Sequence, residues 1–328
     1  SKTQKEIESY CVKSKINNSI ISEFFEEGVI IKTKKKTFYN IYDTTSIKTE
    51  TIKKRSALPS KITVYLSKLC NFRCIHCAVS GGSRYPMELN KKDWFKIIDE
   101  SAKLKIDLFQ ISGGEPLLYK ELLSEILCYA KGKFKNIVIN TNATLIDEHS
   151  ARLLLNVGAM VYVSVYGADG ETYKKVTGTG LFKKAESGIK ILMKNNVNIR
   201  ASVPLINPII RNIKNIEKYI KGLGIKEIAF MGLIPQGRGR ENFEKLATPW
   251  SNYLPILHDY CVKSETMMDN KGGAIIDIPC HRYGIRLSVT SQGSVYPCEF
   301  LPIYLGNVKN ESLLDIVNKK EAKYVYEE

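Results

Sequence analysis

Short β-branched and aromatic runs alternate with amphipathic segments from residue 61 onward, and this alternation is the strongest pattern in the chain. Six runs rich in Val, Ile, Phe or Tyr predict strands at residues 62–66, 107–112, 136–141, 161–166, 198–205 and 227–232. The segments between them place apolar residues at helical spacing and predict helices at residues 91–104, 119–132, 146–158, 182–196 and 212–224. Such alternation is typical of parallel strands joined by right-handed crossovers.

Six β–α units are too few to close an eightfold barrel. We therefore expect the α/β class, with a partial (βα)6 barrel of TIM type. The side chains that perform chemistry should lie at the carboxyl ends of its strands.

The two ends of the chain break the alternation. Residues 1–60 predict a small α+β appendage, in which a helical segment precedes the hairpin VIIKT–TFYNIYD. Beyond residue 235 the pattern predicts a helix at 251–265, a strand–turn–strand at 286–298 and a helix at 312–323. The expected parts are an N-terminal appendage (1–60), a core (61–235) and a small C-terminal domain (236–328).

Composition narrows the class of protein. The chain has no apolar run of about 18 residues and no apolar leader, so we expect a cytoplasmic protein without a membrane span. The net charge is +15. It reflects either a general bias toward lysine or an acidic partner, such as a flavodoxin- or ferredoxin-type reductant or an acidic peptide. No basic patch interleaved with aromatic residues is visible, so we do not expect a nucleic-acid partner.

Three of the eight cysteines lie together just after the first predicted strand. Cys70, Cys74 and Cys77 have the spacing Cys-x3-Cys-x2-Cys, which in a chain without a leader indicates metal binding rather than disulfides. Three thiolates leave one iron of a [4Fe–4S] cluster without a protein ligand, a vacancy that a cofactor can use. A structural zinc site would need a fourth Cys or His ligand placed for tetrahedral coordination. His76 is a poor candidate for that ligand, because it is adjacent to Cys77 and binding of both to one ion would strain the backbone.

The segment Cys70-Asn-Phe-Arg-Cys74-Ile-His76-Cys77 resembles the signature of the radical S-adenosylmethionine (SAM) family, where an aromatic residue usually precedes the last Cys. A second match follows the second predicted strand. Residues Gly113, Gly114, Glu115 and Pro116 resemble the family's GGEP segment, which binds the amino group of SAM. The residue types also support this role independently of the resemblance. Two glycines let the backbone approach a ligand closely, and a carboxylate can pair with an ammonium group.

The resemblance also implies further SAM contacts along the core. Asn140 and Asn142 resemble the strand end that contacts the ribose, and Ser164 resembles a polar position that contacts the ribose or carboxylate. Arg200 on the fifth strand is a candidate for the SAM carboxylate, although a solvent-facing arginine is an equal interpretation. Tyr166 stands where many relatives have Asp, and we expect it to face the cavity.

The C-terminal part resembles the opening of the SPASM and twitch domains, which hold auxiliary [4Fe–4S] clusters. Cys280 and Cys298 bracket Gly293, whose flexibility would permit a hairpin that returns one thiolate to the other. Further cysteines of a full SPASM domain do not follow. Three interpretations remain: Cys261 joins this pair in a second iron–sulfur cluster, the domain has lost its cluster, or the sequence stops short of the natural C-terminus.

The resemblance implies reductive cleavage of SAM at a [4Fe–4S] cluster, giving a 5′-deoxyadenosyl radical that abstracts hydrogen from a substrate. The leading expectation is a peptide undergoing crosslinking or epimerisation, with residues 1–60 as a leader-docking module or a plain structural cap. The alternatives are a radical SAM enzyme of small-molecule or cofactor biosynthesis and a non-catalytic iron–sulfur electron carrier.

Overall fold

A computed structural model describes residues 59–86, 88–248, 275–277, 286–298 and 303–319, together with Ala322. Nearly all of the predicted appendage and the predicted helix at 251–265 lie outside the described residues, as do Cys261 and Cys280.

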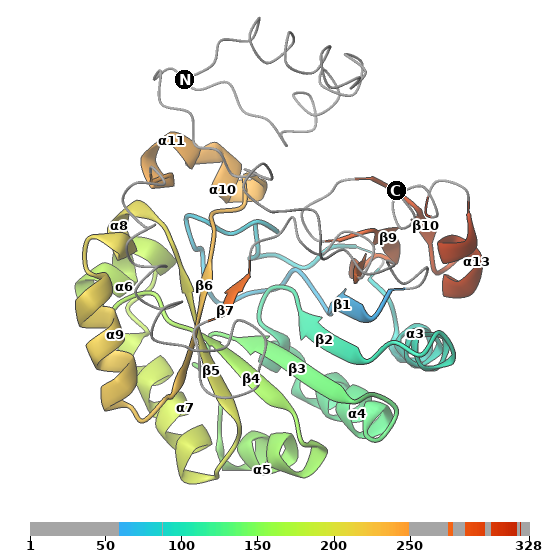
Figure 1. The fold of residues 1–328 in the computed structure, drawn as a ribbon, viewed down its shortest axis with the longest axis horizontal. Helices are drawn as coiled ribbons and strands as arrows, with labels where there is room; N and C mark the ends of the chain where they lie inside the picture. The colour runs from blue at the N-terminus through green and yellow to red at the C-terminus, as the bar shows by residue number, and fades with distance from the viewer. Residues whose placement is uncertain are drawn as a thin grey trace, which may run out of the picture.

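The strands of the described part form one sheet with the order β10-β9-β8-β1-β2-β3-β4-β5-β6-β7. Neighbours from β1 to β6 pair in parallel, and helices cover the outer side of this arc (Figure 1). The strands are β1 (Lys61–Tyr65), β2 (Leu108–Ser112), β3 (Asn136–Thr141), β4 (Met160–Ser164), β5 (Ile199–Pro204), β6 (Glu227–Met231), β7 (Ile275–Asp277), β8 (Arg286–Val289), β9 (Ser294–Tyr296) and β10 (Gly306–Asn307).

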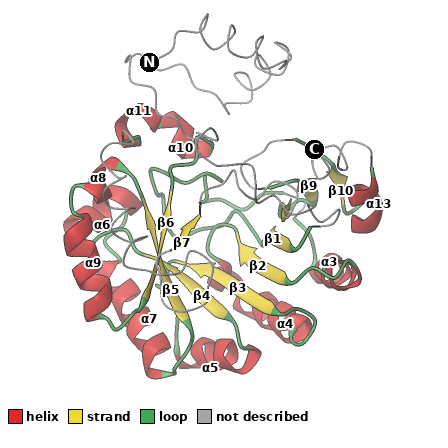
Figure 2. Cartoon of the chain, in the orientation of Figure 1, coloured by secondary structure: helices red, strands yellow, loops and turns green. Residues whose placement is uncertain are grey.

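Helices follow each of the first six strands, as Figure 2 shows by colour. They are α3 (Lys91–Lys103), η2 (Pro116–Tyr119), α4 (Lys120–Ala130), α5 (Glu148–Val157), α6 (Gly170–Thr177), α7 (Phe182–Lys194), α8 (Asn207–Ile210), α9 (Ile213–Gly222), α10 (Gly237–Glu241) and α11 (Phe243–Leu246), and a further helix, α13 (Leu313–Asn318), follows β10. The predicted partial barrel is confirmed. Helix α6 was missed by the sequence pattern, although Asp169 caps it by accepting from Thr172 N–H.

The two faces of the sheet differ in polarity. Val161 and Val163 of β4 are buried in the core cluster, whereas Tyr162 between them is only partly buried and points to the other face. Parallel register places Tyr162 beside Arg200, and Arg200 beside Glu227. The inner face of the arc therefore carries polar side chains, as a site for a polar ligand requires.

The C-terminal strands continue the core sheet instead of forming a second one. Strand β8 pairs in parallel with β1, β7 pairs in parallel with β6, and β9 returns antiparallel to β8. The predicted hairpin turn is present at Gly293, which has φ +92° and donates its N–H to Thr290 O at 2.9 Å. The domain boundary at residue 235 stays a prediction. No helix in the described ranges has the length and apolar character needed to cross a membrane.

Candidate active site

The clustered cysteines lie on residues 66–82, which follow β1 and are called the cluster loop below. The loop is closed at its base, where Gly82 N–H donates to Lys68 O at 2.9 Å. Its middle is fixed to the end of α6, where Arg73 N–H donates to Thr177 O at 2.9 Å. Both contacts are between backbone atoms, so they fix the path of the loop whatever its side chains are.

The three thiols lie in a partly apolar setting. Cys74 is buried, and Cys70 and Cys77 are partly exposed. Phe72 N–H donates to Cys70 Sγ at 3.4 Å, and Gly81 N–H donates to Cys77 Sγ at 3.2 Å. Backbone donors of this kind stabilise the thiolate form, which is the form that binds iron.

Burial keeps two of the thiols neutral when no metal is bound. It raises the pKa of Cys70 to about 11 and raises the pKa of Cys74 more strongly still. The neighbouring thiolates add to the rise at Cys74, and a hydrogen bond from the Tyr166 hydroxyl partly offsets it. Iron cations supply the positive charge that this pocket lacks, so a cationic cluster is the group that would ionise these thiols.

The described residues contain no group of three or more His, Cys, Asp or Glu side chains arranged to hold one metal ion. Three thiolates that each bind a different iron leave the fourth iron of a [4Fe–4S] cluster open, and the three clustered cysteines supply that number of thiolates.

Two glycines pack directly beneath the cluster loop. A Cβ on Gly113 would lie 2.4 Å from Ser67 O, and a Cβ on Gly114 would lie 2.0 Å from Leu69 O. Gly114 N–H donates to Ser67 O at 2.7 Å. We expected these glycines to admit a ligand. The structure shows that the backbone they admit is the cluster loop itself, which joins the two motifs into one unit.

Glu115 is 2% exposed, and its carboxylate already has protein partners. It accepts from Leu117 N–H at 3.1 Å, Thr141 Oγ1 at 2.7 Å and Asn142 N–H at 2.8 Å. Burial raises the pKa of Glu115 to about 7, and these donors oppose the rise. Glu115 caps η2, with buried Pro116 as the next residue, and joins β2 to β3.

The two predicted asparagines have internal partners. Asn140 Nδ2 donates to Ser112 Oγ at 3.2 Å and Asn140 Oδ1 accepts from Gln110. Asn142 Nδ2 donates to Asn71 Oδ1 at 2.8 Å, which ties β3 to the cluster loop. Asn71 was not singled out from the sequence, because its partner lies 71 positions away.

His76 and Ser164 flank Tyr166 near the thiols. The His76 ring lies 5.4 Å from the Tyr166 ring, and Ser164 shares a hydrogen bond with the Tyr166 hydroxyl. His76 Nδ1 is buried without a hydrogen-bond partner, and so is the hydroxyl of Tyr173. Burial, with a contribution from Arg238, lowers the pKa of His76 to about 4. Unpartnered buried polar atoms beside the cysteines fit a polar ligand such as SAM, which would supply their missing partners.

Arg200 is mostly buried and does not face solvent. Its guanidinium forms an ion pair with Glu227 and donates to the Tyr162 hydroxyl at 2.6 Å. A guanidinium has five donors, so Arg200 retains capacity for a carboxylate ligand. Glu227 was missed from the sequence, although it begins the sixth strand.

Arg238, near the start of α10, contacts the cluster loop in a way that the sequence did not reveal. Its Nε donates to Cys74 O at 2.8 Å and its Nη2 donates to Gly81 O at 2.9 Å, on either side of Cys77. A Cβ on the preceding Gly237 would lie 2.4 Å from Ala78 O. Residues 235–238, called the connector below, therefore clamp the cluster loop. The signal of this segment in the sequence is an arginine between two glycines.

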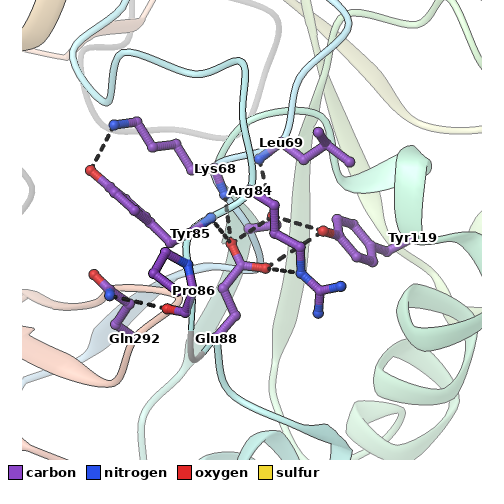
Figure 3. A network of polar contacts seen from close by, with 9 residues as sticks. Lys68, Leu69, Arg84, Tyr85, Pro86, Glu88, Tyr119 and Gln292 are labelled. Atoms are coloured by element: carbon purple, nitrogen blue, oxygen red, sulfur yellow. Dashed lines mark hydrogen bonds and ion pairs between the residues drawn. The ribbon is translucent and has the colours of Figure 1, made fainter.

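Glu88 anchors the start of the cluster loop (Figure 3). Its side chain is 3% exposed and accepts from Ser67 Oγ at 2.8 Å, Lys68 N–H at 3.3 Å and Arg84 Nε at 2.9 Å. Figure 3 also shows Lys68 Nζ donating to the Tyr85 hydroxyl, at 2.6 Å. This network fixes the strand end from which the cysteines are presented.

A cavity of about 430 Å³ opens beside the cluster loop. Its walls come from the end of β1, the loop after Cys77, the connector before α10 and the β8–β9 hairpin. Two cations, Lys68 and Arg240, line it, and no carboxylate of the described residues does. Cys298 lines the same cavity and is partly buried. The cavity therefore lies between residues 78–80 of the cluster loop and the β8–β9 hairpin.

Comparison with known proteins agrees with this geometry. A model of the Radical SAM superfamily matches residues 64–221, and a model of the SPASM iron–sulfur cluster-binding domain matches residues 280–327. The AdoMet-dependent heme synthase of Methanosarcina barkeri is 26% identical over 80% of this chain and 83% of its own length. The structure of Streptococcus suis SuiB bound to SAM aligns with TM-score 0.65 and 16% identity, covering 82% of this chain and 67% of SuiB. Native anSMEcpe with bound AdoMet aligns with TM-score 0.64 and 20% identity, covering 81% of this chain and 83% of anSMEcpe.

The chain therefore carries a radical SAM domain over residues 64–221, and it is an enzyme. It also carries a SPASM domain, and its cofactors are a [4Fe–4S] cluster and SAM, with further iron–sulfur binding indicated by that domain. The interpretation as a non-catalytic iron–sulfur carrier is thereby set aside.

Proposed function

We propose that Cys70, Cys74 and Cys77 each bind one iron of the cluster, and that the carboxyl ends of β2 to β5 hold SAM beside it. The observation that carries this proposal is the direct packing of Gly113 and Gly114 against the backbone of the cluster loop. This packing supports the proposal, because the GGEP segment and the cysteine loop are in direct backbone contact. When bound, the cluster and SAM supply a 5′-deoxyadenosyl radical.

The chain's own residues position and shield this chemistry. Arg238 and the end of α6 hold the cluster loop, and His76 Nδ1 offers an unpartnered polar atom to SAM. Ser164, the last residue of β4, is proposed to contact the polar part of SAM, whereas Arg200, the second residue of β5, lies nearer the amino ends of the strands. The apolar side chains around Cys74, among them Phe72 and Tyr173, exclude water.

The test is SAM cleavage. Anaerobically reconstituted protein with dithionite should form 5′-deoxyadenosine, and the triple change of Cys70, Cys74 and Cys77 to Ala should abolish it. Cys128→Ala is the matched control, because Cys128 is exposed on α4. Cleavage that survives in the triple variant would show that these cysteines do not bind the catalytic cluster.

For the substrate, we propose a peptide undergoing crosslinking or epimerisation, whose reacting residue enters the 430 Å³ cavity. Two proteins with similar folds have been solved with peptides: SuiB with the precursor peptide SuiA, and anSMEcpe with the Cp18Cys peptide. A short open reading frame beside the gene, encoding a Cys-rich or aromatic-rich peptide, would supply the candidate. Incubation of that peptide with enzyme, SAM and reductant should change its mass or stereochemistry.

A second candidate is a small molecule that carries carboxylates. The cations Lys68 and Arg240 line the cavity, and cations at a cavity wall favour an acidic guest. The heme synthase aligns over four-fifths of the chain, and a second relative from the same organism is named Fe-coproporphyrin III synthase. Iron coproporphyrin III is therefore the probe for this alternative. Faster formation of 5′-deoxyadenosine with the porphyrin than with the peptide would favour the second candidate over the first.

A further inference from the structure

One buried cluster runs from the iron-binding loop to the outer helices. Phe72 and Cys74 of the cluster loop pack with Tyr173 of α6 and Ala185 of α7, and Phe182 packs against this group. The ring centres of Phe72 and Tyr173 lie 5.9 Å apart, and those of Tyr173 and Phe182 lie 5.6 Å apart. Cys74 is therefore joined by continuous packing to the start of α7.

The same packing reaches α9. The ring of Phe182 lies 5.5 Å from the ring of Tyr219, which is partly exposed. Helices α6, α7, α8 and α9 lie together on one side of the arc (Figure 1). Electron transfer between proteins weakens steeply with distance, so a donor benefits from docking where closely packed side chains connect the surface to the acceptor.

The helices on this side of the arc carry an excess of positive charge. Helices α6, α7 and α9 carry nine lysines and three glutamates, an excess of six positive charges. Helices α3, α4 and α5 carry six Lys or Arg residues and six Asp or Glu residues, and so have no excess. A general lysine bias would charge both halves of the outer layer alike, so the bias does not explain the difference. Among these six helices, the excess of positive charge therefore lies on α6, α7 and α9, which pack around the buried cluster that contains Cys74.

We propose that the outer face of α6, α7 and α9 is the docking surface for an acidic one-electron donor protein of the flavodoxin or ferredoxin class. This proposal rests on the assignment of Cys74 as a cluster ligand. The reduced donor loses one electron and the oxidised cluster gains it, and no bond or proton changes place. Complementary charge would speed the encounter and align the donor over Tyr219 and Phe182.

The test reverses charge on this face. In one variant the exposed lysines of α6, α7 and α9 are changed as Lys174→Glu, Lys184→Glu and Lys218→Glu. The matched control makes the same change of charge on the neutral half, with Lys92→Glu, Lys103→Glu and Lys131→Glu, which are also exposed. Stopped-flow absorbance measures the rate of cluster reduction by a chemically reduced bacterial flavodoxin, over a range of salt concentrations. Dithionite serves as a small reductant that needs no docking surface.

The measured quantity is the ratio of the flavodoxin rate to the dithionite rate in the same sample, so partial damage to a variant cancels. At low salt we expect this ratio to fall by about 30-fold or more in the α6–α7–α9 variant and by less than about 3-fold in the control. The wild-type flavodoxin rate should also fall as salt rises. Equal ratios in the two variants would overturn the proposal. A wild-type protein without a dithionite-reducible cluster would overturn the proposed function instead.

Discussion

Glu115 shows how one residue can serve the fold and the cofactor together. Its carboxylate accepts three hydrogen bonds from β3 and η2 while it lies at the predicted site of the SAM amino group. A carboxylate offers about four acceptor positions, so one remains for a ligand. Removing the side chain therefore tests two roles at once, and a conservative change is needed to separate them.

The first prediction compares Glu115→Ala with Glu115→Gln. The alanine variant leaves buried donors without an acceptor and should lose about 3 kcal/mol of unfolding free energy. The glutamine variant keeps the size and one oxygen, so it should lose less. Both lose the charge, and we expect SAM binding to weaken by about 2–5 kcal/mol in each. Calorimetric titration with SAM and denaturant unfolding measure the two effects. Unchanged SAM affinity in the glutamine variant would remove Glu115 from the SAM site.

The second prediction concerns pH in the metal-free protein. The pKa of Glu115 is raised to about 7 from a usual 4.5, so the folded state holds this proton more tightly than the unfolded state. Stability from this group is complete below about pH 4.5 and is lost as the pH rises toward 7. Glutamine cannot ionise, so the stability of Glu115→Gln relative to wild type should improve over that window. A constant difference from pH 4.5 to 7, measured by urea unfolding, would contradict the raised pKa.

At the scale of elements, the sequence predicted the part of the fold that is built from repeated strand–helix units. Strands β1 to β6 each show a short apolar run, and the helices between them show helical spacing, so their order and parallel pairing followed. The pairing of β8 with β1 did not follow, because the two strands are separated by more than 200 positions. Helix α6 was missed because it is short, and its eight residues include only two buried apolar side chains, Tyr173 and Val176.

The residues of the candidate site also fall into two groups, those that a local sequence pattern reveals and those that it does not. The cysteines and the GGEP segment are local patterns, and both could be recognised. Arg238 and Glu88 act through contacts with distant backbone, which no spacing reveals. Arg238, for example, reaches an oxygen 164 positions earlier.

The third prediction tests the connector as a clamp on the cluster loop. Arg238→Gln removes the charge and the two-pronged contact with Cys74 O and Gly81 O. Hydrogen bonds from a charged group contribute about 1.5–3 kcal/mol each, so the loop should open more often. We expect reconstituted Arg238→Gln to lose its cluster to an iron chelator at least about 10-fold faster than wild type. Arg211→Gln, at an exposed position after α8, is the control. Equal rates of cluster loss in the two variants would show that the connector does not hold the loop.

At the scale of the whole molecule, the C-terminal hairpin forms one sheet with the radical SAM core. Strand β8 pairs with β1 immediately before the cluster loop, and Cys298 at the end of the hairpin lines the cavity beside that loop. A second cluster at Cys298 would then border a cavity that residues 78–80 of the cluster loop also line. Such a cluster could bind substrate or accept an electron from it.

The fourth prediction is that Cys280 and Cys298 ligate a second iron–sulfur cluster, with Cys261 or a non-cysteine ligand completing the set. The hairpin turn at Gly293 has the left-handed backbone that the prediction required, and the matching SPASM model is an iron–sulfur cluster-binding domain. The decisive sample is the variant without Cys70, Cys74 and Cys77, because any iron that it retains belongs elsewhere. We expect about four irons per chain after reconstitution, as for one [4Fe–4S] cluster, and their loss on adding Cys298→Ala. Cys128→Ala on the same background is the control, since Cys128 is exposed on α4. A chain that retains about zero irons would instead have a hairpin that only walls the substrate cavity, because two thiolates without further ligands do not hold a [4Fe–4S] cluster.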